Sequence, residues 1–291
     1  MLRHRNEKWK LSRVVVLGSK GFVGSHLLNQ LQQENINAIG ISKNEINLLD
    51  GHAEENLLKI LKPNDVLVIV SSIVPCKTIE TLKDNICMMQ IICNVIQKIL
   101  LSHVVYISSD AVYSDDATLV TENSKTMPSS LHGMMHICRE LMVKHAANKV
   151  PLAILRPSLL YGISDPHNSY GPNRFLRQIK SNQDIQLFGE GEEKRDHVFI
   201  EDVARVASLV IQYQSEGILN IATGESHSFK KIAEEMLKEM KSSNIILSSP
   251  RNNPVVHRYF DISASYKAFP DFRYISFQKG LEKIIVKTAS C

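Results

Sequence analysis

Three glycines follow the first apolar run of the chain at a spacing that suits a phosphate group. They are Gly18, Gly21 and Gly24, and they separate the β-branched residues 14–16 from a helical apolar pattern. In a strand that turns into a helix, Gly18 allows the tight turn, Gly21 lets the backbone approach a pyrophosphate, and Gly24 packs the helix against the strand. The spacing predicts a dinucleotide cofactor, and a plain helix cap is the alternative. The residues expected to contact the cofactor are Gly18, Gly21, Phe22, Val23 and Gly24.

Two histidines form a second group that could carry chemistry. His132 and His136 lie four residues apart, so both rings would share one face of a helix. An imidazole titrates near pH ~6.5 and can exchange a proton near neutral pH, whereas two adjacent charged rings would repel each other. The pair therefore predicts acid–base chemistry. A metal site is not expected, because no third ligand or adjacent glutamate accompanies the two histidines.

The overall composition excludes several classes of protein. The 291 residues carry a formal net charge of +4, which is too small to indicate nucleic-acid binding. No C-x-x-C pair occurs, so we expect reduced, mostly buried thiols. No apolar stretch is long enough for a membrane span, and the basic N-terminus lacks the apolar segment of a signal peptide, so a cytoplasmic protein is expected. The five cysteines are Cys76, Cys87, Cys93, Cys138 and Cys291.

Short apolar runs alternate with helical periodicity through the first two thirds of the chain. This alternation predicts a doubly wound α/β fold of the Rossmann type, with a parallel sheet and right-handed crossovers. Residues 12–162 would form mainly the dinucleotide-binding domain. The expected strands lie near 13–17, 37–41, 65–70, 103–108 and 152–156, and the expected helices near 22–33, 53–61, 84–100 and 129–148.

The pattern changes after Gly162. A loop-rich segment precedes shorter elements, which predicts a smaller substrate lobe over residues 163–291 with interleaved elements that return to the sheet. The last part of the chain is expected to be an irregular tail. Helices are expected near 173–181, 201–212 and 228–240, and strands near 185–188 and 218–222.

Five further motifs follow the glycine loop. They are VVYISSDAVY at 104–113, ILRPSLLYG at 154–162, FGEG at 188–191, KRDHVFIEDVA at 194–204 and LNIATGE at 219–225. With these motifs in this order, the chain resembles the extended short-chain dehydrogenase/reductase family, the NAD(P)-dependent epimerases, dehydratases and reductases of nucleotide sugars. The resemblance covers about residues 12–285. It is specific for the family and not for one substrate.

The end of the second expected strand bears on the choice between NAD and NADP. An acidic residue there would accept hydrogen bonds from ribose hydroxyls and repel a 2′-phosphate. This chain has Ser42 and Lys43, which suit a phosphate, so NADP is expected and NAD is the alternative. The resemblance also implies that Asp50 lies near the adenine and Ser71 under the cofactor. Asn85 would support the cofactor or cap the next helix.

The chain departs from the family at its two catalytic positions. The family motif is P-x-x-x-Y-G-x-x-K-x-x-x-E, and its proline, glycine and glutamate correspond to Pro128, Gly133 and Glu140. His132 stands at the tyrosine position and His136 at the lysine position. The resemblance implies that the tyrosine exchanges the proton, while the lysine lowers its pKa and holds the nicotinamide ribose.

Three interpretations of the histidine pair stay open. The pair is a rewired acid–base pair, a remnant in a protein that binds cofactor without turnover, or a structural pair beside other catalytic groups. In the first case His132 exchanges the proton, and His136 supports it or contacts the ribose. Counting bonds, an imidazole falls roughly 2–3 Å short of a phenol oxygen, so a bridging water or a shifted substrate would be needed.

Two polar residues follow the fourth expected strand. Ser109 aligns with the family's catalytic serine or threonine, which hydrogen-bonds the reacting oxygen. Asp110 aligns with the acid of the 4,6-dehydratases and would face the substrate, but Ala111 replaces their glutamate base. The resemblance therefore favours reduction or epimerisation over dehydration.

Arginines in the second half of the chain suit a diphosphate. Arg195 stands in the family's R-D motif and Arg251 is a second candidate, because a guanidinium offers this anion a planar fork of donors. Asn173 would contact the diphosphate or cap a helix. The resemblance implies a reductase or epimerase of a nucleotide-linked sugar in bacterial surface polysaccharide synthesis, and a homodimer formed through the helices near 84–100 and 129–148. A non-catalytic NAD(P)-binding regulator or assembly partner is the alternative.

Overall fold

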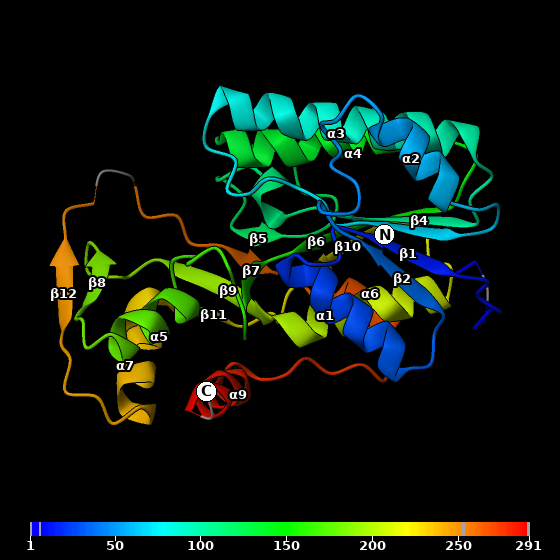
Figure 1. Cartoon of the computed structure of the whole chain (residues 1–291). Coiled ribbons are helices and arrows are strands. Elements are labelled where there is room, and N and C mark those ends of the chain that lie inside the picture. The colour runs from blue at the N-terminus through cyan, green and yellow to red at the C-terminus, as the bar shows by residue number, and fades with distance from the viewer. Residues whose placement is uncertain (1, 6, 252–253, 290–291) are drawn as a thin grey trace.

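A six-stranded parallel sheet forms the centre of the computed structural model, which describes residues 2–5, 7–251 and 254–289 (Figure 1). Its strand order is β10-β6-β4-β3-β1-β2. Every residue of β1, β3 and β4 is buried, as expected for central parallel strands covered on both faces. The strands are β1 (Val14–Leu17), β2 (Ala38–Ile41), β3 (Val66–Ile69), β4 (His103–Ile107), β6 (Leu152–Pro157) and β10 (Gly217–Ile221).

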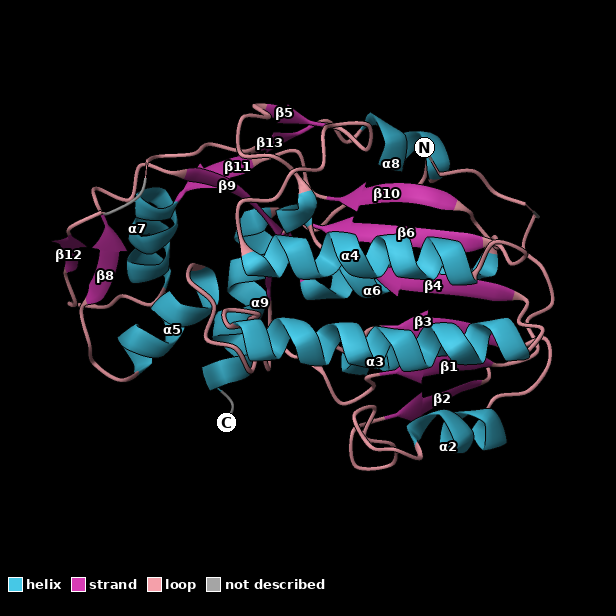
Figure 2. Cartoon of the chain, turned by 90° about the horizontal axis from the view of Figure 1, so that it is seen from above, coloured by secondary structure: helices cyan, strands magenta, loops and turns pink. Residues whose placement is uncertain are grey.

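Helices cover both faces of this sheet. Successive strand residues point to opposite faces, so Val14 and Val16 join one apolar core while Val15 and Leu17 join the other. Figure 2 shows α3 and α4 lying side by side over the second face. The first core contains α1 (Phe22–Gln33) and α6 (Ile200–Gln212), and the second contains α2 (Ala53–Ile60), α3 (Ile79–Lys98) and α4 (Leu131–Ala146). The expected doubly wound α/β fold is confirmed.

The strand order reverses at β1. From β1 the chain moves to β2 on one side, and it then returns to place β3 on the other side. Leu17 at the end of β1 lies in register with Ile41 of β2 and with Ile69 of β3. The carboxyl ends of the three strands therefore meet at one edge, where open α/β sheets bind their ligands.

A smaller set of elements lies beyond the carboxyl edge of the sheet (Figure 1). Its core includes Phe175, Phe199, Phe229 and Leu281. Its strands are β7 (Leu159–Tyr161), β8 (Ile185–Phe188), β9 (Lys194–Phe199), β11 (Ser226–Ser228) and β12 (Ile246–Ser249), and its helices are α5 (Pro172–Lys180), α7 (Phe229–Glu239) and α9 (Phe277–Ala289). Three short elements complete the fold near the site, namely η1 (Asp110–Val112), β5 (Leu119–Val120) and β13 (Tyr259–Phe260), and α8 (Ser263–Ala268) packs beside β10.

Two expectations about helices were wrong. Helix α3 begins at Ile79 and not near residue 84, because Thr78 caps it and forms a capping box with Thr81. The segment expected to be an irregular tail contains α8 and α9. In α9, Phe277, Leu281 and Ile284 recur at helical spacing and pack into the core of the smaller lobe.

The described residues contain free cysteines and no membrane-spanning helix. In this part of the chain, no helix combines the length and apolar character needed to cross a membrane. Four of the cysteines are free: Cys76 is buried, and Cys87, Cys93 and Cys138 are partly buried. Cys291 lies outside the described residues.

A buried ion pair fixes α4 to the sheet. Both carboxylate oxygens of Glu140 accept hydrogen bonds from Arg156 of β6, at 2.8 and 2.6 Å, and Ser108 donates a third at 2.7 Å. Glu140 and Arg156 are 0% and 2% exposed. Removal of either partner would leave the other charge buried and unpaired, which would destabilise the folded protein.

We expect Glu140→Gln to lower the free energy of unfolding by about 3–5 kcal/mol, because it leaves the Arg156 guanidinium buried without a counter-charge. Urea denaturation at neutral pH measures the effect. Glu55→Gln is the matched control, since Glu55 pairs with Lys59 on the exposed surface of α2, where a solvent-screened ion pair contributes little to stability. A Glu140→Gln protein as stable as the control would contradict this account of α4.

Candidate functional site

The glycine loop between β1 and α1 packs too tightly for side chains. Gly18 has a φ of 98°, and a Cβ atom there would lie 2.7 Å from the backbone nitrogen of Ser71. A Cβ atom on Gly24 would lie 2.2 Å from the carbonyl oxygen of Gly18. Because Gly18 and Gly24 lack Cβ atoms, the start of α1 and the segment directly after β3 can both pack against the turn that follows β1.

The N-terminus of α1 is suited to an anion. Its N-cap is Gly21, no side chain caps the helix, and the first turn contains no acidic residue. The first N–H groups of a helix, here those of Phe22, Val23 and Gly24, have no partner within the helix. Together with the helix dipole they favour a phosphate at this position.

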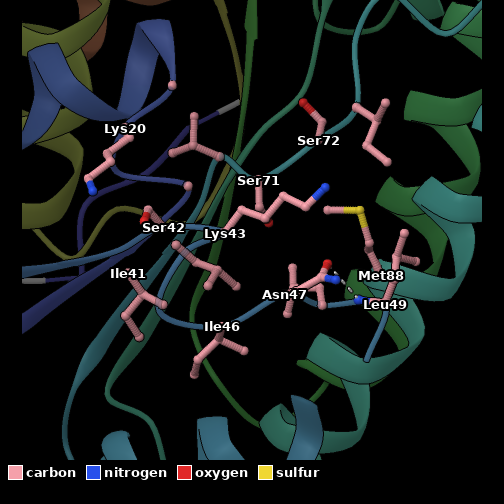
Figure 3. A pocket seen from close by; sticks show the side chains of 16 residues that line it. Lys20, Ile41, Ser42, Lys43, Ile46, Asn47, Leu49, Ser71, Ser72 and Met88 are labelled. Carbon is pink, nitrogen blue, oxygen red and sulfur yellow. Dashed lines mark hydrogen bonds between the residues drawn. The ribbon is translucent and has the colours of Figure 1, made fainter. Parts of the chain in front are cut away.

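A cavity of about 230 Å³ opens where β1, β2 and β3 end. Figure 3 shows the side chain of Lys43 reaching across it toward Met88, with Ser42 and Ser71 among the other lining residues. The cavity combines apolar walls with a few polar groups, as ligand sites do. Five residues predicted from the sequence line it: Gly18, Gly21, Ser42, Lys43 and Ser71.

Two other predicted cofactor residues lie outside the lining. Asp50 is exposed, and its carboxylate accepts a hydrogen bond from Asn47, which does line the cavity. Asn85 is fully buried and does not cap α3. Its side chain binds both the N–H and the carbonyl of Ile73, a lining residue, so it supports the cavity wall indirectly.

A carboxylate at the end of β2 was missed in the sequence analysis. Glu45 accepts hydrogen bonds from both the backbone N–H and the hydroxyl of Ser42. These bonds, with the nearby charge of Lys20, lower the pKa of Glu45 below its ordinary value. The spacing S-x-x-E is a readable signal for this contact, since it is that of a capping box. An acidic group therefore stands beside the position that discriminates NAD from NADP.

The histidine pair lies at the start of α4, which packs closely on η1. Ser130 caps α4 by accepting a hydrogen bond from Gly133 at 3.1 Å. A Cβ atom on Gly133 would lie 2.1 Å from the carbonyl oxygen of Ala111, so glycine is required for this contact. The rings of His132 and His136 lie edge to face, with centroids 4.9 Å apart.

Both imidazoles are held in the neutral form. Burial lowers the pKa of His132 below its ordinary value of 6.5, against a smaller opposing effect of the Asp110 carboxylate. Burial lowers the pKa of His136 further, and the charges of His132 and Arg139 add to this effect. Nδ1 of His132 is buried and has no hydrogen-bond partner among the described residues. His132 can therefore accept a proton at neutral pH.

Ser109 and Asp110 lie beside this pair through the contact of α4 with η1. The hydroxyl of Ser109 caps η1 by accepting a hydrogen bond from Ala111 at 3.1 Å. Asp110 forms an ion pair with the buried Arg258, at 3.4 Å, and Arg258 also donates to the Asp110 carbonyl. Arg258 was missed in the sequence analysis, because no local signal links a residue near β13 to η1.

The two arginines predicted to bind a diphosphate converge on one carboxylate. Arg195 donates to Oε1 of Glu193 and Arg251 donates to Oε2, both at 2.8 Å. Glu193 thus links two residues that are 56 positions apart (251 − 195). Asn173 does not cap α5, whose N-cap is Gly171; it binds Gly162 N–H, and its Nδ2 is buried without a partner among the described residues.

The residues present fit a dinucleotide. The evidence is the cradle that Cβ atoms would fill, the open helix N-terminus and the cavity at the point where the strand order reverses. The histidine pair is not part of the cavity lining, so the cavity accounts for the adenosine and phosphate part alone. No group of three or more potential metal ligands occurs among the residues that the structure describes.

A comparison with protein families identifies the class. The NAD dependent epimerase/dehydratase family matches residues 14–222, and the chain belongs to this family. The resemblance to the extended short-chain dehydrogenases/reductases is thereby confirmed. A putative UDP-glucose 4-epimerase of Methanocaldococcus jannaschii is 27% identical over 274 residues, which cover 86% of this chain and 90% of that protein.

Solved structures share the fold. UDP-glucose 4-epimerase of Thermotoga maritima, determined with UDP-glucose, has a TM-score of 0.84 at 18% identity, over 96% of this chain and 99% of that chain. UDP-glucose 4-epimerase of Thermus thermophilus, determined with NAD, has a TM-score of 0.82 at 18% identity, over 94% and 98%. At this level of identity the likeness establishes the fold alone.

We expect Glu193→Gln to bind inorganic pyrophosphate about three- to tenfold more tightly than the unmodified protein, because Glu193 occupies both arginines. Isothermal titration calorimetry at low salt measures the affinity. Arg195→Gln should weaken binding, and Glu234→Gln, which removes an exposed carboxylate on α7, is the control expected to change it little. Equal affinities for Glu193→Gln and Glu234→Gln would show that Glu193 does not compete with the anion.

Proposed function

We propose that this protein is a nicotinamide-nucleotide-dependent epimerase of a UDP-linked sugar. The observation that carries the proposal is a neutral, half-buried His132 at the start of α4, packed beside Ser109 and Asp110 at the same edge as the glycine cradle. The family membership supports the reaction class. The relatives include UDP-glucose 4-epimerases, whose names support the substrate class.

The chemistry assigned to this chain is proton exchange. A nicotinamide nucleotide held at the glycine cradle would supply reversible hydride exchange with the sugar carbon. His132 takes the proton of the sugar hydroxyl as this carbon is oxidised, through a bridging water if the ring does not reach. The resulting imidazolium is offset by the carboxylate of Asp110. Ser109 orients the oxygen, and His132 returns the proton when the keto intermediate is reduced.

The substrate diphosphate would lie between the smaller lobe and the sheet. Arg195 and Arg251 provide paired donors from β9 and from the segment after β12. The free Nδ2 of Asn173 offers a further donor. The anion would replace Glu193 as the partner of both arginines.

The cofactor proposed is NAD rather than NADP. Ser42 and Lys43 suit a phosphate by type, which was the basis for expecting NADP. In the folded protein the Ser42 hydroxyl and N–H are both used by Glu45, and a 2′-phosphate there would meet its carboxylate. Ribose hydroxyls can donate to this carboxylate instead.

A homodimer formed through α3 and α4 is also proposed. Ile79, Leu141 and Met134 on these helices are 73%, 60% and 41% exposed. Apolar side chains at this level of exposure on two adjacent helices suit the same faces of a second copy.

We expect NADH to bind more tightly than NADPH, and Glu45→Gln to reduce this preference about tenfold by removing the repulsion of the 2′-phosphate. Fluorescence titration with both reduced nucleotides measures the ratio. Glu55→Gln, an exposed carboxylate on α2, is the control expected to leave it unchanged. A preference for NADPH in the unmodified protein would contradict the role given to Glu45.

We expect incubation with NAD and UDP-glucose or UDP-N-acetylglucosamine to yield the 4-epimer, detected by chromatography. His132→Ala should lower kcat about 10²- to 10⁴-fold with nucleotide affinity retained. His145→Ala, on an exposed turn of the same helix, is the control. Because the pKa of His132 is lowered, the neutral base persists at pH 6.5, and kcat/KM should fall only at lower pH.

The same experiment distinguishes an epimerase from a non-catalytic cofactor-binding protein. Cofactor binding without turnover of any UDP-sugar would support a non-catalytic regulator or assembly partner. Full activity in His132→Ala would leave the epimerase proposal in place and would move the base to another residue.

A further inference from the structure

Tyr106 and His136 form an isolated hydrogen-bonded pair under the site. The hydroxyl of Tyr106, on β4, lies 2.9 Å from Nδ1 of His136. Tyr106 is 1% exposed and His136 is 6% exposed, so water does not supply alternative partners to the buried hydroxyl. The described residues give the Tyr106 hydroxyl no other partner, and they give Nε2 of His136 none.

The donor of this hydrogen bond can be inferred from the protons that the phenol and the neutral imidazole carry. Burial raises the pKa of Tyr106 to about 12, so the phenol keeps its proton at neutral pH. If Nδ1 of His136 carried a proton and donated it, the phenol proton would be buried with no acceptor, which is costly. If the phenol donates, Nδ1 is the acceptor, and the proton of the neutral ring is on Nε2. The second arrangement satisfies both buried groups.

A buried arginine lies one helical turn beyond His136. Arg139 is 0% exposed and forms no ion pair with any described carboxylate. It donates to the carbonyl of Ser71 at 2.6 Å and to Asn85 at 3.1 Å, and it lies over the ring of Tyr106 at 5.4 Å. An arginine cannot lose its charge in a protein, so this is a fixed, uncompensated cation that contacts the backbone of a cavity-lining residue.

We propose that Tyr106 is a positioning residue for His136 and that Arg139 provides a fixed positive charge for the nucleotide site. Tyr106 fixes His136 as the tautomer that carries its proton on Nε2, and Arg139 supplies the positive charge that a neutral His136 does not. The proposal rests on the proposed function in one respect, namely that the free Nε2–H is kept for an acceptor on a bound nicotinamide nucleotide. Arg139 then favours that anionic ligand from beneath the end of β3.

The tautomer of His136 can be determined by NMR in the protein without a bound ligand and without catalytic turnover. In protein labelled with ¹⁵N-histidine at pH 7, two-bond ¹⁵N–¹H correlation spectra should show His136 with a protonated Nε2 and an unprotonated Nδ1. Tyr106→Phe should abolish this preference and populate both tautomers. Tyr266→Phe, on α8, is the control expected to leave the His136 signals unchanged. A protonated Nδ1, a doubly protonated ring, or an unchanged Tyr106→Phe spectrum would overturn the assignment.

Measurements of NAD binding test the role of the Arg139 charge separately from the tautomer of His136. Arg139→Lys keeps a cation, whereas Arg139→Met removes it at similar length. We expect Arg139→Met to bind NAD about tenfold more weakly than Arg139→Lys in calorimetry. Circular dichroism and thermal unfolding verify that both variants are folded, and if Arg139→Met is not, Arg139→Gln replaces it. Equal affinities of the charged and uncharged variants would overturn this half of the proposal. A protein that shows the predicted tautomer but no epimerase activity would refute the proposed function alone.

Discussion

Helix α1 can point its N-terminus at the end of β1 because Gly18 and Gly24 carry no side chains. A single Cβ atom at Gly24 would overlap the carbonyl of Gly18, and one at Gly18 would overlap the backbone of Val70 and Ser71, directly after β3. The open helix N-terminus and the adjoining cavity exist because these three backbone segments meet. Every further element of the site is placed relative to this contact, since β3 and β4 carry Ser71 and Ser109 at their ends.

A second close contact places the histidines. Gly133 lets α4 approach η1, and the buried pair of Glu140 and Arg156 fastens the same helix to β6. The orientation of α4 is therefore determined at two points, one turn on either side of His136. An imidazole is shorter than the tyrosine and lysine that the sequence resemblance implies at these positions, so its chemistry would depend more strongly on how rigidly the helix is held.

The fold was largely predictable from the sequence, and the site only in part. Periodicity located the sheet strands and α1 closely, because central parallel strands are continuous apolar runs and α1 follows a glycine loop. Six short strands were missed, since two to six residues carry little periodic signal: β5, β7, β9, β11, β12 and β13. The glycine cradle was found because its requirement is local. Glu45 had a local signal in S-x-x-E, whereas the contacts of Glu193 with Arg251 and of Asp110 with Arg258 join distant segments and have none.

The sequence resemblance implies a tyrosine and a lysine where this chain has His132 and His136, and this exchange would change how a base is prepared. A phenol is a useful base only when a nearby cation lowers its pKa, whereas an imidazole needs no such help. Burial is the main cause that lowers the pKa of His132, and a cation placed directly beside it would make it a weaker base. Under the proposed function the roles would separate accordingly: Asp110, paired with Arg258, would offset the charge that His132 gains, while the fixed cation of Arg139 lies one turn further along α4, against the carbonyl of Ser71.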